Sequence, residues 1–228
     1  MEYLFPPALL PSLAIAGSAL RFPVHRIYCI GRNYADHAKE MGSSVDRGNP
    51  VFFCKPADAI VADRAQIPYP IGTNDLHHEV EMVVALQSGG VDIAEAQALR
   101  HVLGYAVGLD LTRRDLQNIA KTKALPWDSA KAFDRSAPLS ALRRASEIGH
   151  PPKGRLSLEV NGELRQQSDI AQMIFGVAEI IAMLSRLFEL KAGDLIFTGT
   201  PAGVAALKHG DRFHARLENV AELHGAIA

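Results

Sequence analysis

Three acidic residues in this chain are spaced so that their carboxylates can bind one divalent cation. Residues 75–84 predict a β-strand, because apolar residues alternate there with two acids, Glu79 and Glu81. Every second side chain of a strand points to the same face, so both carboxylates share one face. Asp110 ends a second apolar strand, residues 104–110, and three carboxylates at strand ends make an all-oxygen site suited to Mg²⁺, Mn²⁺ or Ca²⁺. A Glu-x-Glu pair alone is also typical of a solvated strand edge, and the presence of Asp110 favours the metal site.

His37 and Glu40 form a candidate pair for the activation of water. They are three residues apart on a short helix predicted at 36–41, so they share a face of that helix. A histidine that is held by a carboxylate is oriented and becomes a better base. The alternative for this spacing is an ordinary ion pair on a solvated surface.

Three further residues could contact a ligand beside the carboxylates. Lys131 lies in a segment of otherwise small and apolar residues, and Arg114 and Gln117 lie one turn apart on a helix predicted after Asp110. The alternatives are a surface lysine whose apolar stem is buried and a solvated helix face. Taken singly, none of these patterns distinguishes a residue that contacts a ligand from an ordinary surface residue.

Several other chemistries are disfavoured by the motifs. The segment 199–203, Gly-Thr-Pro-Ala-Gly, lacks the Lys-Ser/Thr of a phosphate-binding loop and predicts a tight turn. There is no Gly-x-Ser-x-Gly elbow, and Cys29 and Cys54 lie in apolar runs, so covalent serine or cysteine hydrolysis is not indicated. His77 and His78 lack the zinc-protease spacing, and neighbours on a strand point to opposite faces.

The composition is that of one ordinary soluble domain. The 228 residues are 48% hydrophobic and 21% charged, and the formal net charge of −1 without a Lys/Arg cluster indicates neither a nucleic-acid nor a membrane partner. The apolar runs are too short to span a bilayer, and the N-terminus lacks the pattern of a signal peptide. We expect Cys29 and Cys54 to be buried free thiols of a cytoplasmic protein.

The predicted elements favour an α+β fold built on a large mixed sheet. Besides the strands at 75–84 and 104–110, strands are expected at 13–16, 20–22, 26–30, 51–55, 59–61, 66–69, 156–166 and 195–198. The C-terminal tail is expected to form two edge strands. Helices are expected at 36–41, at 93–101, from about 112 to 123, and at 177–190. Strands outnumber helices and no regular βαβ alternation occurs, which disfavours Rossmann and TIM architectures.

Local signals place several boundaries. Gly42 is expected to end the first helix in a left-handed cap. Thr112 and Asp115 have the spacing of a capping box at the start of the helix after Asp110. Asn161-Gly162 between two strands predicts a hairpin, and residues 123–136 are expected to form a loop.

Taken in order, these segments resemble the fumarylacetoacetate hydrolase family. The resemblance extends from residue 22 to residue 211 and is nearest to the small bacterial acylpyruvate hydrolases, among them fumarylpyruvate hydrolase. The motifs that carry it are Ile30-Gly-Arg-Asn-Tyr-Ala-Asp-His37-Ala-Lys-Glu40, Phe53-Cys-Lys55-Pro-Ala-Asp58, Leu76-His-His-Glu79-Val-Glu81, Gly104-Tyr-Ala-Val-Gly-Leu-Asp110-Leu-Thr-Arg-Arg-Asp-Leu-Gln117, Leu125-Pro-Trp-Asp-Ser-Ala-Lys131-Ala-Phe-Asp134 and Gly193-Asp-Leu-Ile-Phe-Thr-Gly-Thr200-Pro-Ala-Gly203.

The resemblance implies a β-roll catalytic domain over residues 22–228, preceded by a lead-in and a small hairpin in residues 1–21. It implies a homodimer. It also implies one Mg²⁺ or Mn²⁺ per chain, with Glu79, Glu81 and Asp110 as the ligands.

It further implies a role for each of the other candidate residues. His37 and Glu40 match the dyad that activates water, carried on a segment that orders over the substrate, and Lys131 matches the lysine beside the metal. The residues that match substrate contacts are Arg114, Gln117 and Thr200.

The implied reaction is hydrolysis of a carbon–carbon bond in an acylpyruvate, that is, a 2,4-dioxo acid. The expected substrate is fumarylpyruvate, cleaved to fumarate and pyruvate in gentisate-type aromatic catabolism. The alternatives within the family are decarboxylation of a 2-oxo acid and isomerisation of 2-hydroxyhepta-2,4-diene-1,7-dioate, neither of which needs an attacking water. His37 favours hydrolysis over both, and a metal-dependent binding protein without activity would leave the His37–Glu40 pair without a role.

Overall fold

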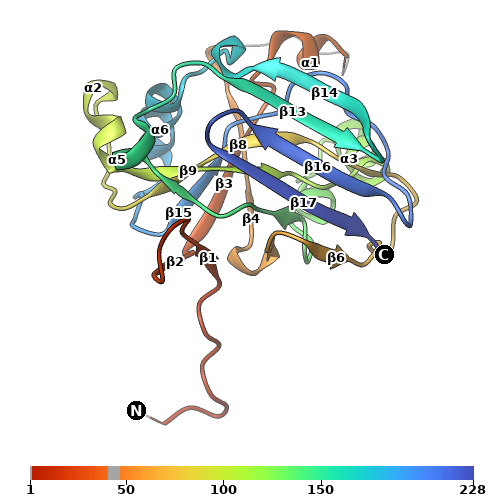
Figure 1. The fold of residues 1–228 in the computed structure, drawn as a ribbon, viewed down its shortest axis with the longest axis horizontal. Coiled ribbons are helices and arrows are strands. Elements are labelled where there is room, and N and C mark those ends of the chain that lie inside the picture. Colours follow the sequence, from red (N-terminus) through yellow and green to blue (C-terminus); the bar gives the residue numbers. More distant parts are fainter. Residues whose placement is uncertain (1, 41–46) are drawn as a thin grey trace.

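Two mixed β-sheets form the centre of the molecule in a computed structural model that describes residues 2–40 and 47–228 (Figure 1). The larger sheet has six strands, in the order β12 (Arg143–Arg144), β9 (Val102–Leu109), β8 (Val80–Leu86), β15 (Asp194–Phe197), β3 (Arg26–Gly31) and β4 (Val51–Lys55). The smaller sheet has five strands, in the order β14 (Glu163–Asp169), β13 (Arg155–Val160), β16 (Arg212–Leu217), β17 (Ala221–Ile227) and β6 (Ala65–Ile67). The predicted α+β fold with a mixed sheet is confirmed.

The remaining strands form three short pairs, and the helices are short. The pairs are β1 (Ser12–Ala14) with β2 (Arg21–Pro23), β7 (Leu76–His77) with β10 (Thr112–Arg113), and β5 (Ile60–Val61) with β11 (Ala137–Pro138). The helices are α1 (Ala35–Glu40), α2 (Glu95–Ala98), α3 (Arg114–Thr122), α4 (Asp128–Lys131), α5 (Ala145–Ile148) and α6 (Val177–Leu187), with 3₁₀ turns at Ala57–Ala59, Leu99–His101 and Ile170–Gln172. No helix in the described ranges is long and apolar enough to cross a membrane.

The main apolar core lies between the two sheets. Val80, Met82 and Val84 of β8 contribute to it, together with Leu158 of β13. Val83 points to the other face of the six-stranded sheet, into a second core that the β1–β2 hairpin helps to cover. Since both faces of β8 are covered, every residue of this strand is buried, its acid included.

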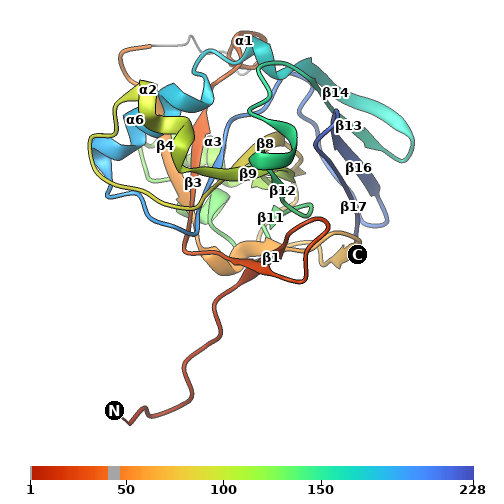
Figure 2. The same ribbon diagram turned by 60° about the vertical axis from the view of Figure 1, so that its left-hand side comes forward.

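The helix α6 packs against the main core at one end of the sheets. Ile180, Ile181 and Leu184 are buried there, as the helical apolar stripe predicts. Figure 2 shows α6 and α2 on the side of the molecule opposite the five-stranded sheet. The predicted hairpins are confirmed as well: β1 pairs with β2, and β13 pairs with β14 across Asn161-Gly162, where both residues have positive φ angles of 54° and 81°.

Two predictions about chain pairing and loops are wrong. The last two strands are not edge strands, because β17 pairs in parallel with β6. The strand β6 lies far from β17 in the sequence, so no local pattern indicates this pairing. The expected loop 123–136 contains α4, a single helical turn that is too short to produce a periodic signal.

Two predictions about side chains are also wrong. Thr112 and Asp115 form no capping box, because the Thr112 hydroxyl bonds to the Asp110 carbonyl and Asp115 accepts hydrogen bonds from Thr73 and Asn74. Cys54 is exposed rather than buried, since β4 lies at the edge of its sheet. The expected cap at Gly42 lies outside the described residues. The domain division at residue 22 stays a prediction.

Asn33 fixes the segment that leads from β3 into α1. Its side chain is fully buried, and its amide nitrogen donates to the carbonyl oxygens of Phe175 and Thr198, over 3.0 Å and 2.7 Å. Its carbonyl oxygen accepts a hydrogen bond of 2.7 Å from the Phe175 backbone nitrogen. One side chain therefore ties the entry to α1 to the end of β15.

We expect Asn33→Ala to lower the free energy of unfolding by about 2–4 kcal/mol, because three buried backbone groups lose their hydrogen-bond partner. Urea denaturation measures this change. The control is Asn118→Ala on the exposed face of α3, expected to change stability by less than about 0.5 kcal/mol. Equal effects of the two substitutions would contradict the role assigned to Asn33.

Candidate active site

The carboxylates of Glu79, Glu81 and Asp110 come together where β8 and β9 meet. Glu79 lies just before β8, Glu81 lies within it, and Asp110 follows β9. Each contributes an oxygen within 4.8 Å of the others, and all three side chains are buried. The antiparallel pairing of β8 with β9 opposes Val80 to Leu109 and thereby brings Asp110 beside the two glutamates. The predicted strand is interrupted between β7 and β8, but the shared face of the two glutamates is retained.

Three cations surround this carboxylate cluster. Lys131 Nζ lies 2.7 Å from Glu79 Oε2 and 2.6 Å from Asp110 Oδ2. Lys55 Nζ lies 2.8 Å from Asp110 Oδ1, and Arg114 Nη2 lies 2.5 Å from Glu79 Oε1. All three cations are buried. Lys131 and Arg114 are therefore not ordinary surface side chains, which is the alternative prediction for them.

Burial and neighbouring charges set the protonation of these groups. Burial alone would raise the pKa of Glu79, but Lys131 and Arg114 hold it well below its usual range. Burial lowers the pKa of Lys131, and Asp110 and Glu79 outweigh this effect, so the pKa is raised. Both side chains are therefore ionised at neutral pH.

Glu81 differs from the other two acids because no cation of the described chain is in ion-pair contact with it. Its Oε2 accepts a hydrogen bond of 2.6 Å from the Gly199 backbone nitrogen. Burial, followed by the charges of Asp110 and Glu79, raises its pKa well above the usual range. Asp110 Oδ1, in contrast, has the ammonium group of Lys55 at 2.8 Å. A buried oxygen cluster with this unmet demand for positive charge fits a hard divalent cation.

His37 and Glu40 lie on one face of α1, as their spacing predicts. His37 Nδ1 is 3.4 Å from Glu40 Oε2, and both carboxylate oxygens of Glu40 accept from the Gly203 backbone nitrogen at 3.1 Å. His37 is buried and lines the same pocket as the three acids, whereas Glu40 lies behind it, partly exposed. Burial lowers the pKa of His37, although Glu79 and Glu40 oppose this effect.

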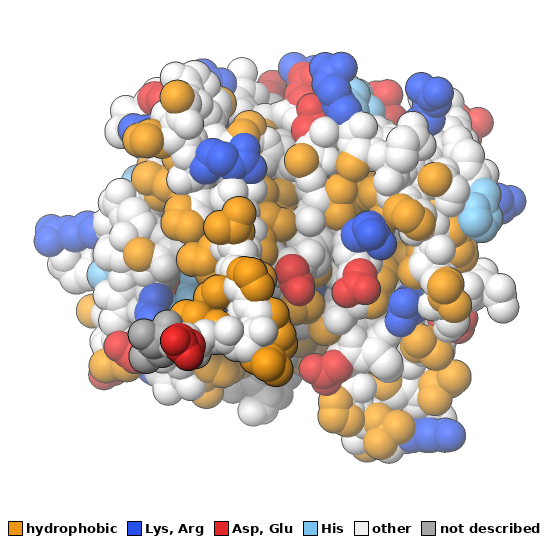
Figure 3. Space-filling model, turned by 90° about the horizontal axis from the view of Figure 1, so that it is seen from below, with side chains coloured by type: hydrophobic (Ala, Val, Ile, Leu, Met, Phe, Trp, Pro, Cys, Tyr) orange, Lys and Arg blue, Asp and Glu red, His pale blue; other side chains and the backbone are white. Residues whose placement is uncertain are grey.

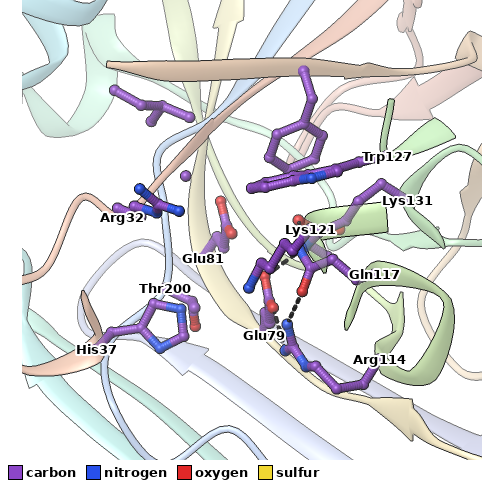
Figure 4. Close-up of a pocket in the computed structure, with 14 residues that line it drawn as sticks. Arg32, His37, Glu79, Glu81, Arg114, Gln117, Lys121, Trp127, Lys131 and Thr200 are labelled. Atoms are coloured by element: carbon purple, nitrogen blue, oxygen red, sulfur yellow. Dashed lines mark hydrogen bonds and ion pairs between the residues drawn. The ribbon is translucent and has the colours of Figure 1, made fainter. Parts of the chain in front are cut away.

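Arg114, Gln117 and Thr200 also line this pocket (Figure 4). Arg114 Nη1 donates to Gln117 Oε1 over 2.5 Å, so the guanidinium orients both Glu79 and the Gln117 amide. Thr200 Oγ1 accepts a hydrogen bond of 2.8 Å from Gln166 Nε2. The structure therefore brings the predicted site residues together. All of them except Glu40 line the pocket, and Glu40 contacts His37. Their chemical roles stay predictions.

Sequence reasoning missed two residues that support the site. Lys55 belongs to one of the quoted motifs, but only its burial beside Asp110 shows what it contacts. Gln166 is buried and bridges two elements: its Oε1 accepts from the Val80 nitrogen and contacts His78 Nδ1, and its Nε2 binds Thr200. A glutamine in a largely polar hairpin strand, followed by a second glutamine, gives no local signal of this role.

The comparisons with known proteins agree with this fold and site. The family model described as fumarylacetoacetate (FAA) hydrolase C-terminal matches residues 26–228, and the chain belongs to this family. The predicted β-roll type of catalytic domain is thereby confirmed. A solved structure of fumarylpyruvate hydrolase from Pseudomonas aeruginosa, in complex with Mn²⁺ and pyruvate, is 51% identical and has a TM-score of 0.97. That similarity covers 100% of this chain and 99% of the other.

Curated relatives carry a different activity in their names. The mitochondrial oxaloacetate tautomerase FAHD1 of Rattus norvegicus is 45% identical over 197 residues, which are 86% of this chain and 89% of the relative. The oxaloacetate tautomerase YcgM of Escherichia coli (strain K12) is 45% identical over 196 residues, with the same coverage. The chain is thus an enzyme of a family that includes both hydrolases and tautomerases.

Proposed function

We propose that this chain is a metal-dependent acylpyruvate hydrolase that cleaves fumarylpyruvate to fumarate and pyruvate. The observation that carries the proposal is the cluster of three buried carboxylates, of which Glu81 lacks a cationic partner among the described residues, beside a buried histidine. Glu79, Glu81 and Asp110 would hold one Mg²⁺ or Mn²⁺. The Mn²⁺ and pyruvate bound to the Pseudomonas aeruginosa relative support this choice of ion and product.

The bound cation would supply Lewis-acid chemistry, which makes pyruvate enolate a better leaving group. His37 would remove a proton from water, and the hydroxide oxygen would attack the distal carbonyl carbon. Nδ1 of His37 faces Glu40, which leaves Nε2 to accept that proton. Cleavage of the bond between C3 and C4 then gives fumarate, and pyruvate enolate takes up a proton at C3.

Gln117 and Lys131 would stabilise the oxyanion formed by this attack. Gln117 Oε1 is engaged by Arg114, so its amide NH₂ group is left to donate. Lys131 Nζ donates its three hydrogens to Glu79, Asp110 and Thr112, so it would contribute its positive charge rather than a hydrogen bond. Donors fixed in advance by such contacts lower the barrier because they need no reorganisation during the reaction.

Oxaloacetate tautomerisation is the second candidate function, because two curated relatives at 45% identity carry that name. The same cation would serve, since both reactions pass through an enol or enolate of a 2-oxo acid. Tautomerisation needs no attacking water. It still moves a proton between the enol oxygen and C3, so the His37–Glu40 pair suits either reaction. The fumarylpyruvate hydrolase relative, 51% identical over the whole of this chain, favours hydrolysis.

Pyruvate release from fumarylpyruvate tests the proposal directly. With Mn²⁺ present we expect rapid release, and with excess EDTA we expect release to stop, because the ion is required to stabilise the enolate. Enol-to-keto conversion of oxaloacetate is measured in parallel. Hydrolysis that survives complete chelation would contradict the metal role, and tautomerisation without hydrolysis would favour the second candidate.

The metal ligands are tested by Glu81→Gln, which removes one anionic ligand and retains the shape of the side chain. We expect the affinity for Mn²⁺, measured by isothermal titration calorimetry, to fall by at least about 100-fold. Glu95→Gln, on the exposed helix α2, is the control and is expected to bind Mn²⁺ as the unmodified chain does. Unchanged Mn²⁺ binding by Glu81→Gln would place the ion elsewhere.

The role of His37 is tested by His37→Ala, which we expect to lower kcat for hydrolysis by about 10²- to 10⁴-fold, the usual contribution of a general base. Because burial lowers the pKa of His37, the histidine is neutral at pH 7, and kcat/KM should decline only below the ordinary histidine pKa of 6.5.

Glu40→Gln adds a directional test of the same pair. The hydrogen bond and the charge of Glu40 both raise the pKa of His37, so their removal lowers it further. The acid limb of the kcat/KM profile should then move to lower pH, while the plateau falls because the base is weaker and less well oriented. A shift of this limb to higher pH would contradict the assignment of His37 as the base.

We also propose that the chain forms a homodimer through its N-terminal lead-in. Residues 2–11 extend away from the two sheets, and five large apolar side chains are exposed on them, namely Tyr3, Leu4, Phe5, Leu9 and Leu10. Figure 3 shows apolar side chains gathered on this face of the molecule. Exposed apolar groups of this extent are typical of a surface that another chain covers.

Light scattering of the full chain should give twice the chain mass of 24.7 kDa. Replacement of Leu4, Phe5 and Leu9 by serine should shift the population towards monomer as the protein is diluted. The control replaces the exposed Ile71, which lies on a separate loop. A monomeric full chain, or a serine variant as dimeric as the control, would contradict this proposal.

A further inference from the structure

Two cations line the candidate active-site pocket without an anionic partner. Arg32 and Lys121 both contribute to its wall, yet neither forms an ion pair with any described residue. The other buried cations of the pocket, Lys55, Lys131 and Arg114, are each paired with Glu79 or Asp110. Arg32 and Lys121 therefore bring positive charge into the pocket that the neighbouring carboxylates do not pair with.

Arg32 is held in an unusual backbone conformation. It directly follows β3 and has a φ angle of 60°, in the left-handed region that side chains other than glycine rarely adopt. The next residue, Asn33, is fixed by three buried hydrogen bonds to Phe175 and Thr198, which hold the backbone in place. Strain that the surroundings enforce in this way is often found where a side chain must be presented to a ligand.

Lys121 presents its ammonium group to the same pocket from the last turn of α3. Its Nζ lies 5.6 Å from the centre of the Trp127 ring, and the side chain is only partly exposed. Burial, and then the positive charges of Arg114 and Arg32, lower the pKa of Lys121 to about 8, although the charge of Glu79 opposes this effect. Figure 4 shows Lys121 and Arg32 coming from different elements into one space. An anion bound between them would relieve their mutual repulsion.

We propose that Arg32 and Lys121 bind the distal carboxylate of the substrate, so that the enzyme selects 2-oxo acids that carry a second carboxylate at the far end. The inference rests on the proposed function, since it gives a binding site to the other end of the same substrate. A cation held by Glu79, Glu81 and Asp110 would bind the 2-oxo acid end of the substrate. The only remaining charge on a substrate such as fumarylpyruvate then meets the only unpaired cations that the described residues offer to this pocket.

A matched pair of substrates tests this assignment. One is a 2,4-dioxo acid that ends in a carboxylate, and the other is the same molecule with that carboxylate as a methyl ester. The unmodified enzyme should prefer the free acid by at least about 10-fold in kcat/KM, as expected for a charge-assisted hydrogen bond. This comparison needs no variant and does not depend on how a substitution affects folding.

The variants are Lys121→Met and Arg32→Gln, each of which should lower the preference for the free acid by about 10- to 100-fold. Lys121→Arg should restore most of it, because the positive charge is retained. The matched control is Lys123→Met, an exposed lysine two residues along the chain, which should leave the preference unchanged. Equal losses on both substrates, or no loss on either, would overturn the proposal.

A binding measurement separates failure of this inference from failure of the proposed function. Fumarate and its monomethyl ester are titrated into the Mn²⁺-loaded protein in the presence of pyruvate, so that only the distal part of the pocket is open. Fumarate should bind at least about 10-fold more tightly than the ester, and Lys121→Met should remove the difference. If the chain hydrolyses no acylpyruvate but this difference is found, the anion subsite stands and the reaction is another one. If hydrolysis occurs without any preference in rate or binding, the subsite is wrong and the hydrolase proposal stands.

Discussion

The structure depends on one electrostatic constraint, the burial of three carboxylates at a single point. Removal of a carboxylate from water costs several kcal/mol unless a partner compensates for it. Ion pairs with Lys131 and Lys55 compensate the buried charge of Asp110. Ion pairs with Lys131 and Arg114 do the same for Glu79. Among the described residues, only the backbone nitrogen of Gly199 binds the Glu81 carboxylate. A cluster built in this way is stable yet still attracts a cation, and this combination is what a metal-dependent enzyme requires.

The surrounding fold serves this constraint in several ways. The antiparallel pairing of β8 with β9 sets the three acids side by side, and the apolar cores on both faces of β8 exclude water from them. The turn after β15 supplies the backbone nitrogen of Gly199 to Glu81 and that of Gly203 to Glu40. The same turn thus contacts both the carboxylate cluster and the His37–Glu40 pair. Movement of this turn would therefore disturb the acids and the proposed base together.

The parts of the site that could be predicted are those set by local spacing. The alternation around Glu79 and Glu81 fixed their common face, and the spacing of His37 and Glu40 did the same on a helix. The contacts of Lys55 and Gln166 could not be predicted, because they depend on segments that are remote in the sequence. For the same reason the parallel partner of β17 was missed. The helix α4 was missed because a single turn leaves no period to detect.

The family to which the chain belongs contains enzymes named for different reactions. The most direct measurement is a crystal structure of this protein grown with Mn²⁺ and pyruvate, with anomalous scattering recorded at the manganese edge. Our account predicts one strong peak bounded by oxygens of Glu79, Glu81 and Asp110, with pyruvate on its open side. An absent peak, or a peak at any other place with the three acids unligated, would contradict it.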